Sequence, residues 1–192
     1  MLHKTRGIVF KFFKYGDTSI IAKVFTSKFG LQTYIINGVR SKRSRHKIAL
    51  FQPLTMLEMV VYHKPNKEIN RIAEIKCETP FTSVHSEMQK TAIAMFLAEV
   101  MYKTIKEEGA SEDLFDFIFS SIVLFDHAAS HYQNFHLQFL LKLSKYLGFA
   151  VDTSEQVFGS LDNKEKELML KLTVSSYEEW IQLENETRRK FL

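Results

Sequence analysis

The stretch Asn37-Gly38-Val39-Arg40-Ser41-Lys42-Arg43-Ser44-Arg45-His46-Lys47 separates two strand-like runs of the chain. Five of its last eight residues carry a permanent positive charge: Arg40, Lys42, Arg43, Arg45 and Lys47. Burying even one of these cations without a partner would cost several kcal/mol, on the order of the whole stability of a domain. The stretch therefore predicts a displayed cationic loop that is held in place by the strands on both sides.

The segments around this loop, within the first 80 residues, have the composition of β-strands. Five runs are rich in β-branched and aromatic residues and are bounded by turn-forming residues: residues 5–14, 19–26, 31–39, 53–62 and 68–77. Gly30 follows the second run, where a glycine can adopt a positive φ. Five short strands joined by tight turns, with one long loop, predict a small closed barrel.

The hydrophobic pattern becomes helical after Thr79-Pro80. Apolar residues recur at helical spacing in residues 86–109, 114–125, 132–147 and 161–172, and a last helix is expected from Ser176. We therefore predict an α+β protein with two domains, a five-stranded β-barrel in residues 1–80 and an all-α helical domain in residues 81–192.

The overall composition is that of an ordinary globular protein, with 45% hydrophobic and 25% charged residues. The chain has one cysteine, Cys77, which rules out an internal disulfide and fits a reducing compartment. We find neither a secretory signal region nor an apolar run long enough to span a bilayer. These features predict a cytoplasmic protein that does not enter a membrane.

The positive charge is concentrated in the predicted barrel. Residues 1–80 contain 15 Lys and Arg against 5 Asp and Glu, a net charge of +10, whereas residues 81–192 contain 11 against 17, a net charge of −6. Outside the loop, the barrel cations include Lys4, Arg6, Lys11, Lys14, Lys23 and Lys28. A basic barrel attracts polyanions, and such barrels hold single strands by combining cations for phosphates with aromatic rings for bases.

Two other interpretations of the same charges stay open. The loop can be a solvated surface with no specific partner, or the barrel can dock an acidic protein instead of a nucleic acid. Tyr15, Phe29 and Tyr34 are candidates for stacking on bases, although rings at such positions more often belong to the core or to an ordinary surface. Because nothing resembles a recognition helix, we expect the loop to hold the phosphate backbone rather than to read bases.

The sequence offers no catalytic site. It contains no Gly-rich phosphate loop, no G-x-S-x-G elbow and no Walker lysine, and Cys77 lies in a strand-like context. Asp126, His127, His131 and His136 lie close together in sequence, but they lack the glutamate of an H-E-x-x-H site. We therefore predict no enzyme activity, no bound metal and no cofactor, and we assign these histidines to surface or helix-end positions.

Several segments of the predicted barrel resemble the bacterial RecO family of DNA repair proteins. They are Thr5-Arg6-Gly7-Ile8-Val9, Tyr15-Gly16-Asp17-Thr18-Ser19-Ile20-Ile21, Phe25-Thr26-Ser27-Lys28-Phe29-Gly30-Leu31, Asn37-Gly38-Val39-Arg40-Ser41-Lys42-Arg43-Ser44-Arg45 and Leu50-Phe51-Gln52-Pro53-Leu54. The resemblance covers about the first 80 residues. Beyond them only the general plan is similar, most clearly in residues 137–147, which are followed by Gly148-Phe149.

The resemblance implies an N-terminal OB-fold barrel, a helical domain and a non-catalytic role in recombinational repair. Members of the family bind single- and double-stranded DNA, anneal complementary strands, work with RecR and bind the acidic, hydrophobic tail of single-stranded DNA-binding protein to help RecA load. By resemblance, the DNA backbone would be contacted by Arg40, Lys42, Arg43, Arg45 and Lys47, and we add Arg6, Lys11 and Lys14 from the basic barrel.

The chain departs from the family pattern in two respects. Many members carry four zinc-binding cysteines after the position of Gly148-Phe149, and this chain has none there, so no metal is implied. The family also usually continues past the equivalent of Arg188-Arg189, which makes this chain short at its C-terminus.

Overall fold

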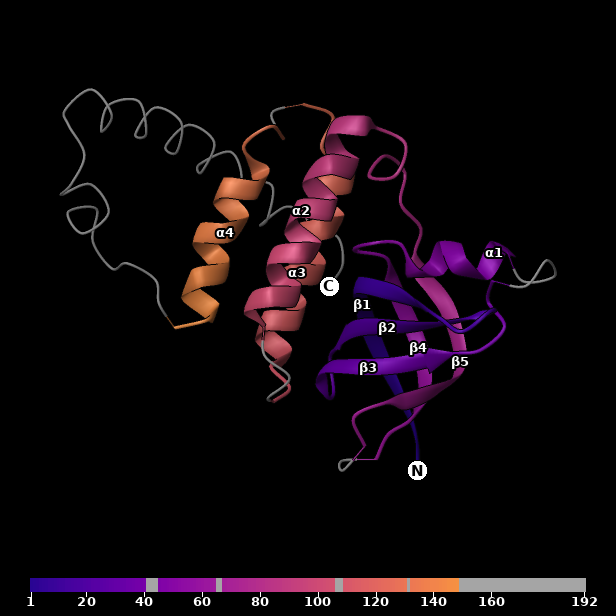
Figure 1. Cartoon of the computed structure of the whole chain (residues 1–192). Helices are drawn as coiled ribbons and strands as arrows, with labels where there is room; N and C mark the ends of the chain where they lie inside the picture. Colours follow the sequence, from indigo (N-terminus) through magenta and orange to yellow (C-terminus); the bar gives the residue numbers. More distant parts are fainter. Residues whose placement is uncertain (41–44, 65–66, 106–108, 131, 149–192) are drawn as a thin grey trace, which may run out of the picture. The chain divides into compact units, whose positions relative to one another are not determined.

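The computed structural model of the protein describes residues 1–40, 45–64, 67–105, 109–130 and 132–148 (Figure 1). The strands are β1 (Leu2–Tyr15), β2 (Ser19–Thr26), β3 (Gly30–Ile36), β4 (Met56–Tyr62) and β5 (Asn70–Thr79). The helices are α1 (Arg45–Ile48), the 3-10 helix η2 (Ala49–Phe51), α2 (Met88–Thr104), α3 (Glu112–His127) and α4 (Phe135–Tyr146). The prediction of a barrel followed by helices is confirmed, and the helices expected in residues 161–172 and from Ser176 lie outside the described residues.

The strands form a closed barrel in the order β1-β2-β3-β5-β4. Neighbouring strands are antiparallel except for the parallel pair β3 and β5. The long strand β1 closes the barrel, because residues 2–8 pair with β4 and residues 7–15 pair with β2. The barrel core consists of Val9, Ile20, Ala22, Val24, Tyr34, Val39, Phe51, Leu57, Met59 and Val61.

The fourth strand begins later than the sequence predicts. Leu54 has a φ of 65°, in the left-handed region, and this turns the chain out of strand geometry before Met56. The Leu54 backbone N–H donates to the Val9 carbonyl at 2.7 Å, and the Val9 N–H donates to the Thr55 carbonyl at 3.0 Å. The segment that begins at Pro53 therefore pairs with the β-bulge of β1 rather than extending β4.

The cationic segment of residues 37–47, called the basic stretch below, also differs from a plain loop. Residues 41–44 lie outside the described residues, and the chain then forms α1 and η2 in place of irregular structure. Val39 and Phe51, which are both 1% exposed, belong to the barrel core on either side of the cations. The burial of these two apolar side chains fixes both ends of the stretch to the barrel.

The turn between β2 and β3 depends on a glycine. Gly30 has a φ of 65°, and a Cβ at this position would lie 2.5 Å from the carbonyl oxygen of Gly109. The Thr26 hydroxyl donates to the Gly30 carbonyl at 2.9 Å and accepts from the Phe29 N–H at 3.1 Å. The predicted positive φ of Gly30 is confirmed, and the close approach of residue 109 is a second reason for glycine at this position.

Helix α2 and the first part of α3 cover one side of the barrel. Phe25 on β2 stacks on Phe10 of β1 at 5.7 Å between ring centroids and packs against Phe115 of α3 at 6.0 Å.

Ser111 caps α3 by accepting a hydrogen bond from the Leu114 N–H at 3.2 Å, as its position before two acidic residues predicts.

The chain divides within α3 into two compact units, Met1–Phe119 and Ser120–Leu192. In the second unit, Phe125 and Phe135 stack at 4.6 Å between ring centroids, and Phe139 lies next to Phe135. The domain boundary at residue 80 stays a prediction. Within the part of the chain that the structure describes, no helix combines the length and the apolarity needed to cross a bilayer.

Candidate nucleic-acid interface

The first cation of the basic stretch is fixed against the turn between β1 and β2. The Arg40 N–H donates to the Thr18 carbonyl at 2.9 Å, and its Nη1 donates to the Gly16 carbonyl at 3.0 Å. The Ser19 hydroxyl donates to the Asn37 side-chain oxygen at 3.2 Å, which adds a second link between the two loops. Arg40 is half-buried as a residue, and its guanidinium, whose bond to Gly16 is exposed, keeps further N–H groups that do not bond to Gly16.

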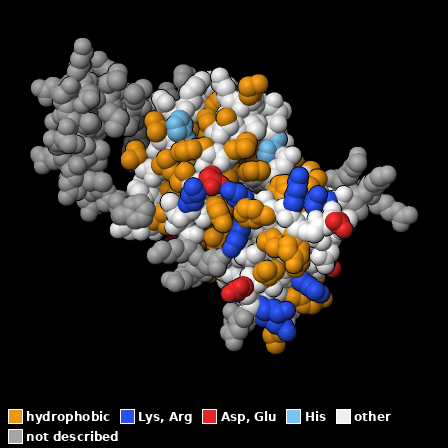
Figure 2. Space-filling model, viewed as in Figure 1, with side chains coloured by type: hydrophobic (Ala, Val, Ile, Leu, Met, Phe, Trp, Pro, Cys, Tyr) orange, Lys and Arg blue, Asp and Glu red, His pale blue; other side chains and the backbone are white. Residues whose placement is uncertain are grey.

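Other cations and one aromatic ring are exposed in this part of the barrel. Lys14 and Tyr15 end β1, directly before the turn that Arg40 contacts, and the Tyr15 side chain is 53% exposed. Lys47 is exposed on α1. Lys42 and Arg43 lie outside the described residues, and Arg45 begins α1 with its side chain outside the description. Figure 2 shows Lys and Arg side chains lying among apolar side chains on the visible face of the molecule.

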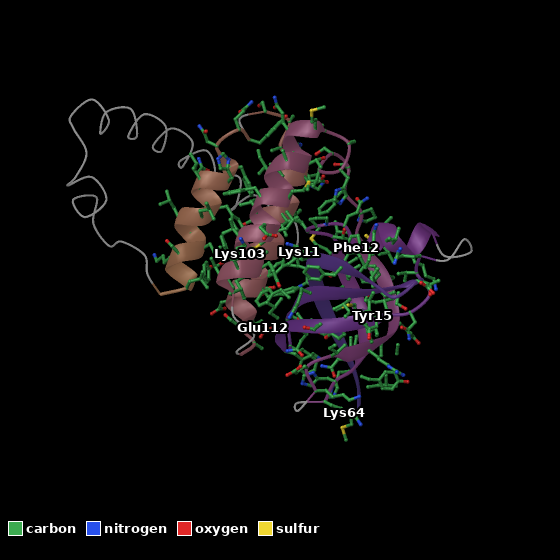
Figure 3. All side chains as sticks on the ribbon, viewed as in Figure 1. Lys11, Phe12, Tyr15, Lys64, Lys103 and Glu112 are labelled. Carbon is green, nitrogen blue, oxygen red and sulfur yellow. The ribbon has the colours of Figure 1, made fainter. Side chains whose placement is uncertain are left out.

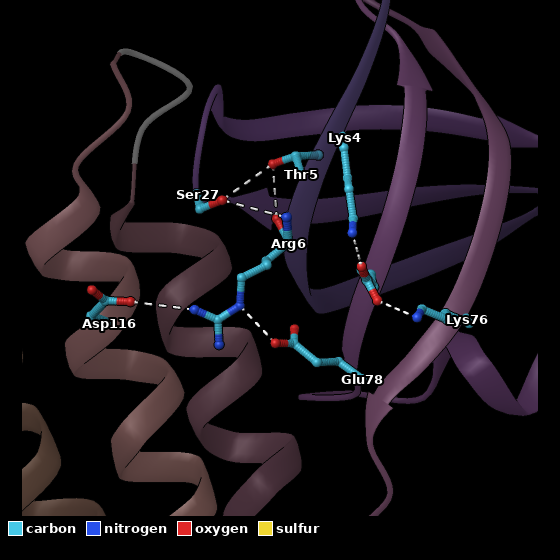
Figure 4. A network of polar contacts seen from close by, with 8 residues as sticks. Lys4, Thr5, Arg6, Ser27, Lys76, Glu78 and Asp116 are labelled. Atoms are coloured by element: carbon cyan, nitrogen blue, oxygen red, sulfur yellow. Dashed lines mark hydrogen bonds and ion pairs between the residues drawn. The ribbon is translucent and has the colours of Figure 1, made fainter. Parts of the chain in front are cut away.

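Arg6, which the sequence also assigns to the DNA surface, is engaged inside the protein (Figure 4). Its Nε donates to a carboxylate oxygen of Glu78 at 2.7 Å, and its Nη1 lies 3.6 Å from the carboxylate of Asp116 on α3. The guanidinium carbon lies 4.1 Å from the ring centroid of Phe119 and 5.3 Å from that of Phe115. Arg6 therefore joins β1 to β5 and to α3 by ion pairs and cation–π contacts.

Lys11 has a similar position toward α2 (Figure 3). Its Nζ donates to a carboxylate oxygen of Glu99 at 2.8 Å and lies 5.4 Å and 5.5 Å from the ring centroids of Tyr102 and Phe13. The hydrogen bond from Lys11 is the first cause that holds the pKa of Glu99 below its ordinary value. The assignment of Arg6 and Lys11 to DNA stays a prediction, but binding a phosphate would compete with these partners.

The three candidate stacking rings have three different environments. Tyr34 is fully buried in the barrel core, the more frequent of the environments expected for it, so its ring is not accessible to a base. Burial raises the pKa of the Tyr34 hydroxyl, which has no hydrogen-bond partner among the described residues. Phe29 is half-buried and stacks on His63 at 3.9 Å between ring centroids. Only Tyr15, of these three, presents a largely exposed ring.

A second basic region, at the hairpin between β4 and β5, was missed by the sequence analysis. A pocket of about 430 Å³ is lined by Tyr62, Lys64, Lys67, Ile69, Asn70 and Arg71. These six residues include three cations and no acid. The signal was present in the sequence as two lysines in one turn, but only the strand pairing shows that Arg71 lies opposite Tyr62.

The buried Asn70 side chain organises this hairpin. Its oxygen accepts from the Lys64 N–H at 3.2 Å, and its amide donates to the Lys67 carbonyl and to the Gln32 side-chain oxygen at 3.4 Å each. The side chain is 2% exposed. Because these bonds are intramolecular, the backbone of both lysines is fixed before any ligand binds.

Two exposed lysines of the barrel are already paired with an acid of the protein and are therefore less available to bind a phosphate. Lys4 and Lys76 both form ion pairs with Glu58 on β4. The hydrogen bonds from Lys4 and then Lys76 lower the pKa of the Glu58 carboxyl to about 2. Both ammonium groups are therefore engaged within the protein, and the single carboxylate offsets one of their two charges.

The structure shows no group of three or more possible metal ligands among the residues it describes. Asp126 is buried, and the His127 Nδ1 lies 2.8 Å from the Val123 carbonyl one helical turn before it. His131 lies outside the described residues.

For Cys77, burial is the main cause that raises the pKa of the thiol, as expected of a side chain packed in a strand.

Both parts of the chain, the barrel and the helices that follow it, are similar to known proteins. Residues 1–81 match the family model for the N-terminal part of recombination protein O, and residues 85–173 match the model for its C-terminal part. The chain belongs to the RecO family. The curated RecO proteins it matches include that of Bacteroides fragilis, with 42% identity over 148 residues, which cover 77% of this chain and 61% of the relative.

Two further RecO relatives give the same result. "DNA repair protein RecO" of Flavobacterium johnsoniae is 39% identical over 153 residues, covering 79% of this chain and 64% of the relative. The protein of the same name from Porphyromonas gingivalis is 31% identical over 154 residues, covering 79% and 63%. The chain thus spans somewhat more than three-fifths of the length of these RecO relatives. A solved asparaginyl-tRNA synthetase of Entamoeba histolytica aligns with a TM-score of 0.32 and 16% identity over 64% of this chain and 30% of its own, too low to inform on fold or function.

Proposed function

We propose that this chain is a DNA-binding recombination mediator in DNA repair, as the names of its relatives suggest. It would bind single- and double-stranded DNA, promote the annealing of complementary strands and assist RecA loading. Its proposed protein partners are RecR and the C-terminal tail of single-stranded DNA-binding protein. None of these steps requires a catalytic group, a metal or a cofactor from this chain.

The observation that carries the proposal is the fixed position of Arg40 against the turn between β1 and β2. The two hydrogen bonds from Arg40 hold the start of the basic stretch against Gly16 and Thr18, in the turn that follows Lys14 and the end of β1. A cationic surface of this kind lowers the repulsion between two phosphate backbones, and this allows two strands to sample their pairing register. Annealing then follows from base pairing in the DNA.

The test is a salt-dependent binding titration with a charge-matched control. We expect the variant with Arg40, Lys42, Arg43 and Arg45 replaced by alanine to bind DNA more weakly. Each lost phosphate contact should reduce the slope of log K against log salt by about 0.9 for duplex and about 0.7 for single strands. The control replaces four other surface lysines by alanine, so that net charge changes equally: Lys4, Lys76, Lys103 and Lys145.

Unchanged affinity and slope in the basic-stretch variant would contradict the proposal, as would an equal loss in the control. The charge pattern also supports a second candidate function, an adaptor whose basic barrel docks an acidic protein. Fluorescence anisotropy with a labelled oligonucleotide and with a labelled acidic peptide separates the two. The adaptor would bind the peptide and leave the oligonucleotide free at physiological salt.

A further inference from the structure

One acid of helix α2 holds two lysines where the helix meets the barrel. The Lys11 Nζ donates to a carboxylate oxygen of Glu99 at 2.8 Å, and the Lys103 Nζ, one helical turn after Glu99, lies 3.6 Å from the same carboxylate group. Figure 3 shows Lys11 and Lys103 close to each other at this junction. The single carboxylate therefore offsets one of the two positive charges.

Two aromatic rings hold Lys11 independently of the acid. Its Nζ lies 5.5 Å from the ring centroid of Phe13 on β1 and 5.4 Å from that of Tyr102 on α2. The two rings also form an edge contact with each other, at 6.5 Å between centroids. Because these contacts do not involve Glu99, they keep Lys11 in position when the carboxylate is removed.

The ion pair between Lys11 and Glu99 is open to solvent. The two side chains are 36% and 41% exposed. An ion pair of this exposure contributes little to stability, because water screens it on both sides. A phosphate oxygen forms the same kind of charge-assisted hydrogen bond with an ammonium group as a carboxylate oxygen does. A phosphate can therefore compete with Glu99 for Lys11.

Lys11 lies on the strand that leads to the anchored start of the basic stretch. Lys14 follows it by three residues, about 10 Å at the rise of a strand. Arg40 is bonded to Gly16 in the turn after β1. In the strand pairing, Lys11 is the direct partner of Lys23 on β2, so the two lysines share a face of the sheet. A nucleic acid held by the basic stretch thus extends toward Lys11.

We propose that Glu99 is an autoinhibitory residue, whose carboxylate occupies the Lys11 ammonium group in place of a phosphate of the nucleic acid. Lys11 then adds little to the affinity for nucleic acid while the pair is intact. When Lys11 leaves, Glu99 keeps Lys103 as its partner, so the displaced acid is not left unpaired. This inference rests on the proposed function and adds to it a residue that lowers the affinity.

The main experiment removes the negative charge of Glu99 in the full 192-residue chain. Glu99→Gln keeps the shape of the side chain and frees Lys11 for one more phosphate contact. This contact should steepen the slope of log K against log salt by up to about 0.7 for an oligothymidine and about 0.9 for a hairpin duplex. Counted from about 1 M salt, these slopes give gains in affinity of up to about fivefold and about eightfold at about 0.1 M salt.

Three further variants separate the ion pair from the net charge. Glu74→Gln removes an exposed acid on β5, so it changes the net charge equally and should raise the affinity much less. Glu99→Gln in the Lys11→Ala background should give no larger gain than Glu74→Gln, because the cation to be freed is absent. Glu99→Asp keeps the charge one methylene from its position, and its affinity should stay close to that of the wild type. Thermal unfolding verifies that each variant retains the fold.

The possible outcomes separate the inhibitory role from the proposed function. A gain for Glu99→Gln that exceeds that of Glu74→Gln and disappears without Lys11 supports the role. Equal gains for the two glutamine variants, a gain that persists in the Lys11→Ala background, or a loss of affinity in Glu99→Gln overturns it. The proposed function then stands if the wild type binds DNA and the basic-stretch variant binds it more weakly. If neither the wild type nor Glu99→Gln binds an oligonucleotide, both proposals fail.

Discussion

The barrel presents two apolar outer faces, and the same strands contribute to both. On β1, Phe10 is 2% exposed and stacks on Phe25 under the helices, whereas Phe13, three residues later, is 42% exposed and keeps one edge contact with Tyr102 of α2, at 6.5 Å between ring centroids. On β2, Phe25 belongs to the covered face and Ile21 to the open one. Residue type therefore does not distinguish the two faces, because the position of α2 and α3 decides which apolar side chains are buried.

The cations follow the same division. Arg6 and Lys11 face acidic residues on the covered side, where they join the barrel to the helices. Lys14 and Lys64 are exposed. A basic residue of this barrel is thus a good candidate for binding phosphate only if no acid of the protein has already neutralised it.

The largest expected effect comes from removing a ring on the covered face. Phe25→Ala should lower the free energy of unfolding by about 3–5 kcal/mol, because it leaves a cavity between Phe10 and Phe115. Phe13→Ala, the matched change at a ring that is 42% exposed, should cost less, about 1–2 kcal/mol, because only its contacts with Tyr102 and Lys11 are lost. Urea denaturation followed by circular dichroism measures both. Equal losses at the two positions would show that the open face also contributes to the folded core.

A smaller loss of stability is expected at Arg6, the cation that joins the barrel to α3. Arg6→Ala should lower the free energy of unfolding by about 1–2 kcal/mol, a value kept low because the side chain is 37% exposed and its ion pairs are partly screened. Arg6→Lys keeps the charge but loses the planar contact with Phe119, so its loss should be intermediate. Lys14→Ala, the control on the same strand, should change stability by less than about 0.5 kcal/mol. A loss as large for Lys14→Ala as for Arg6→Ala would contradict the distinction between cations that pair with acids on the covered side and cations that are exposed elsewhere.

Much of the barrel could be predicted from local sequence signals. The range of β2 was predicted without error, and the positive φ at Gly30 was correct, because both depend on neighbouring residues. The start of β4 was wrong, because a long-range contact with the bulge at Val9 holds Leu54 in the left-handed region.

The candidate site was less predictable, because its properties depend on distant partners. Arg6 bonds to an acid 72 residues away, and Lys11 to an acid 88 residues away, and no pattern near either cation indicates these pairs. Tyr15 and Tyr34 are the same residue type in similar strands, yet one ring is 53% exposed and the other is fully buried. Which residues of neighbouring strands lie opposite one another, such as Tyr62 and Arg71, depends on turn geometry as well as on the hydrophobic pattern.

The same division predicts a difference in DNA binding between two lysines of β1. Lys14→Ala should reduce the salt slope for duplex binding by about 0.9, the value for one lost phosphate contact. Lys11→Ala should reduce it by less than half as much, because Lys11 is already paired with Glu99 and its loss removes little free positive charge. Anisotropy titrations at four or more salt concentrations give both slopes. A larger reduction for Lys11→Ala would assign DNA contact to the covered side.

The smallest expected effect concerns Glu58, where two cations away from the helix contacts are also paired. The pKa of this carboxyl is about 2 in the folded protein, because Lys4 and Lys76 bond to it, and about 4.3 in an unfolded chain. Since the folded pKa is the lower one, the carboxylate stabilises the protein fully above about pH 4.3 and loses this contribution as the pH falls toward 2. Wild type should therefore melt at a higher temperature than Glu58→Gln at pH 5.5, and the difference should shrink at pH 3. Glu74→Gln, on the neighbouring strand β5, controls for the removal of one surface carboxylate. A difference in melting temperature that stays constant between these pH values would show that Glu58 does not hold the two lysines, and would return Lys4 and Lys76 to the set of cations available for phosphate.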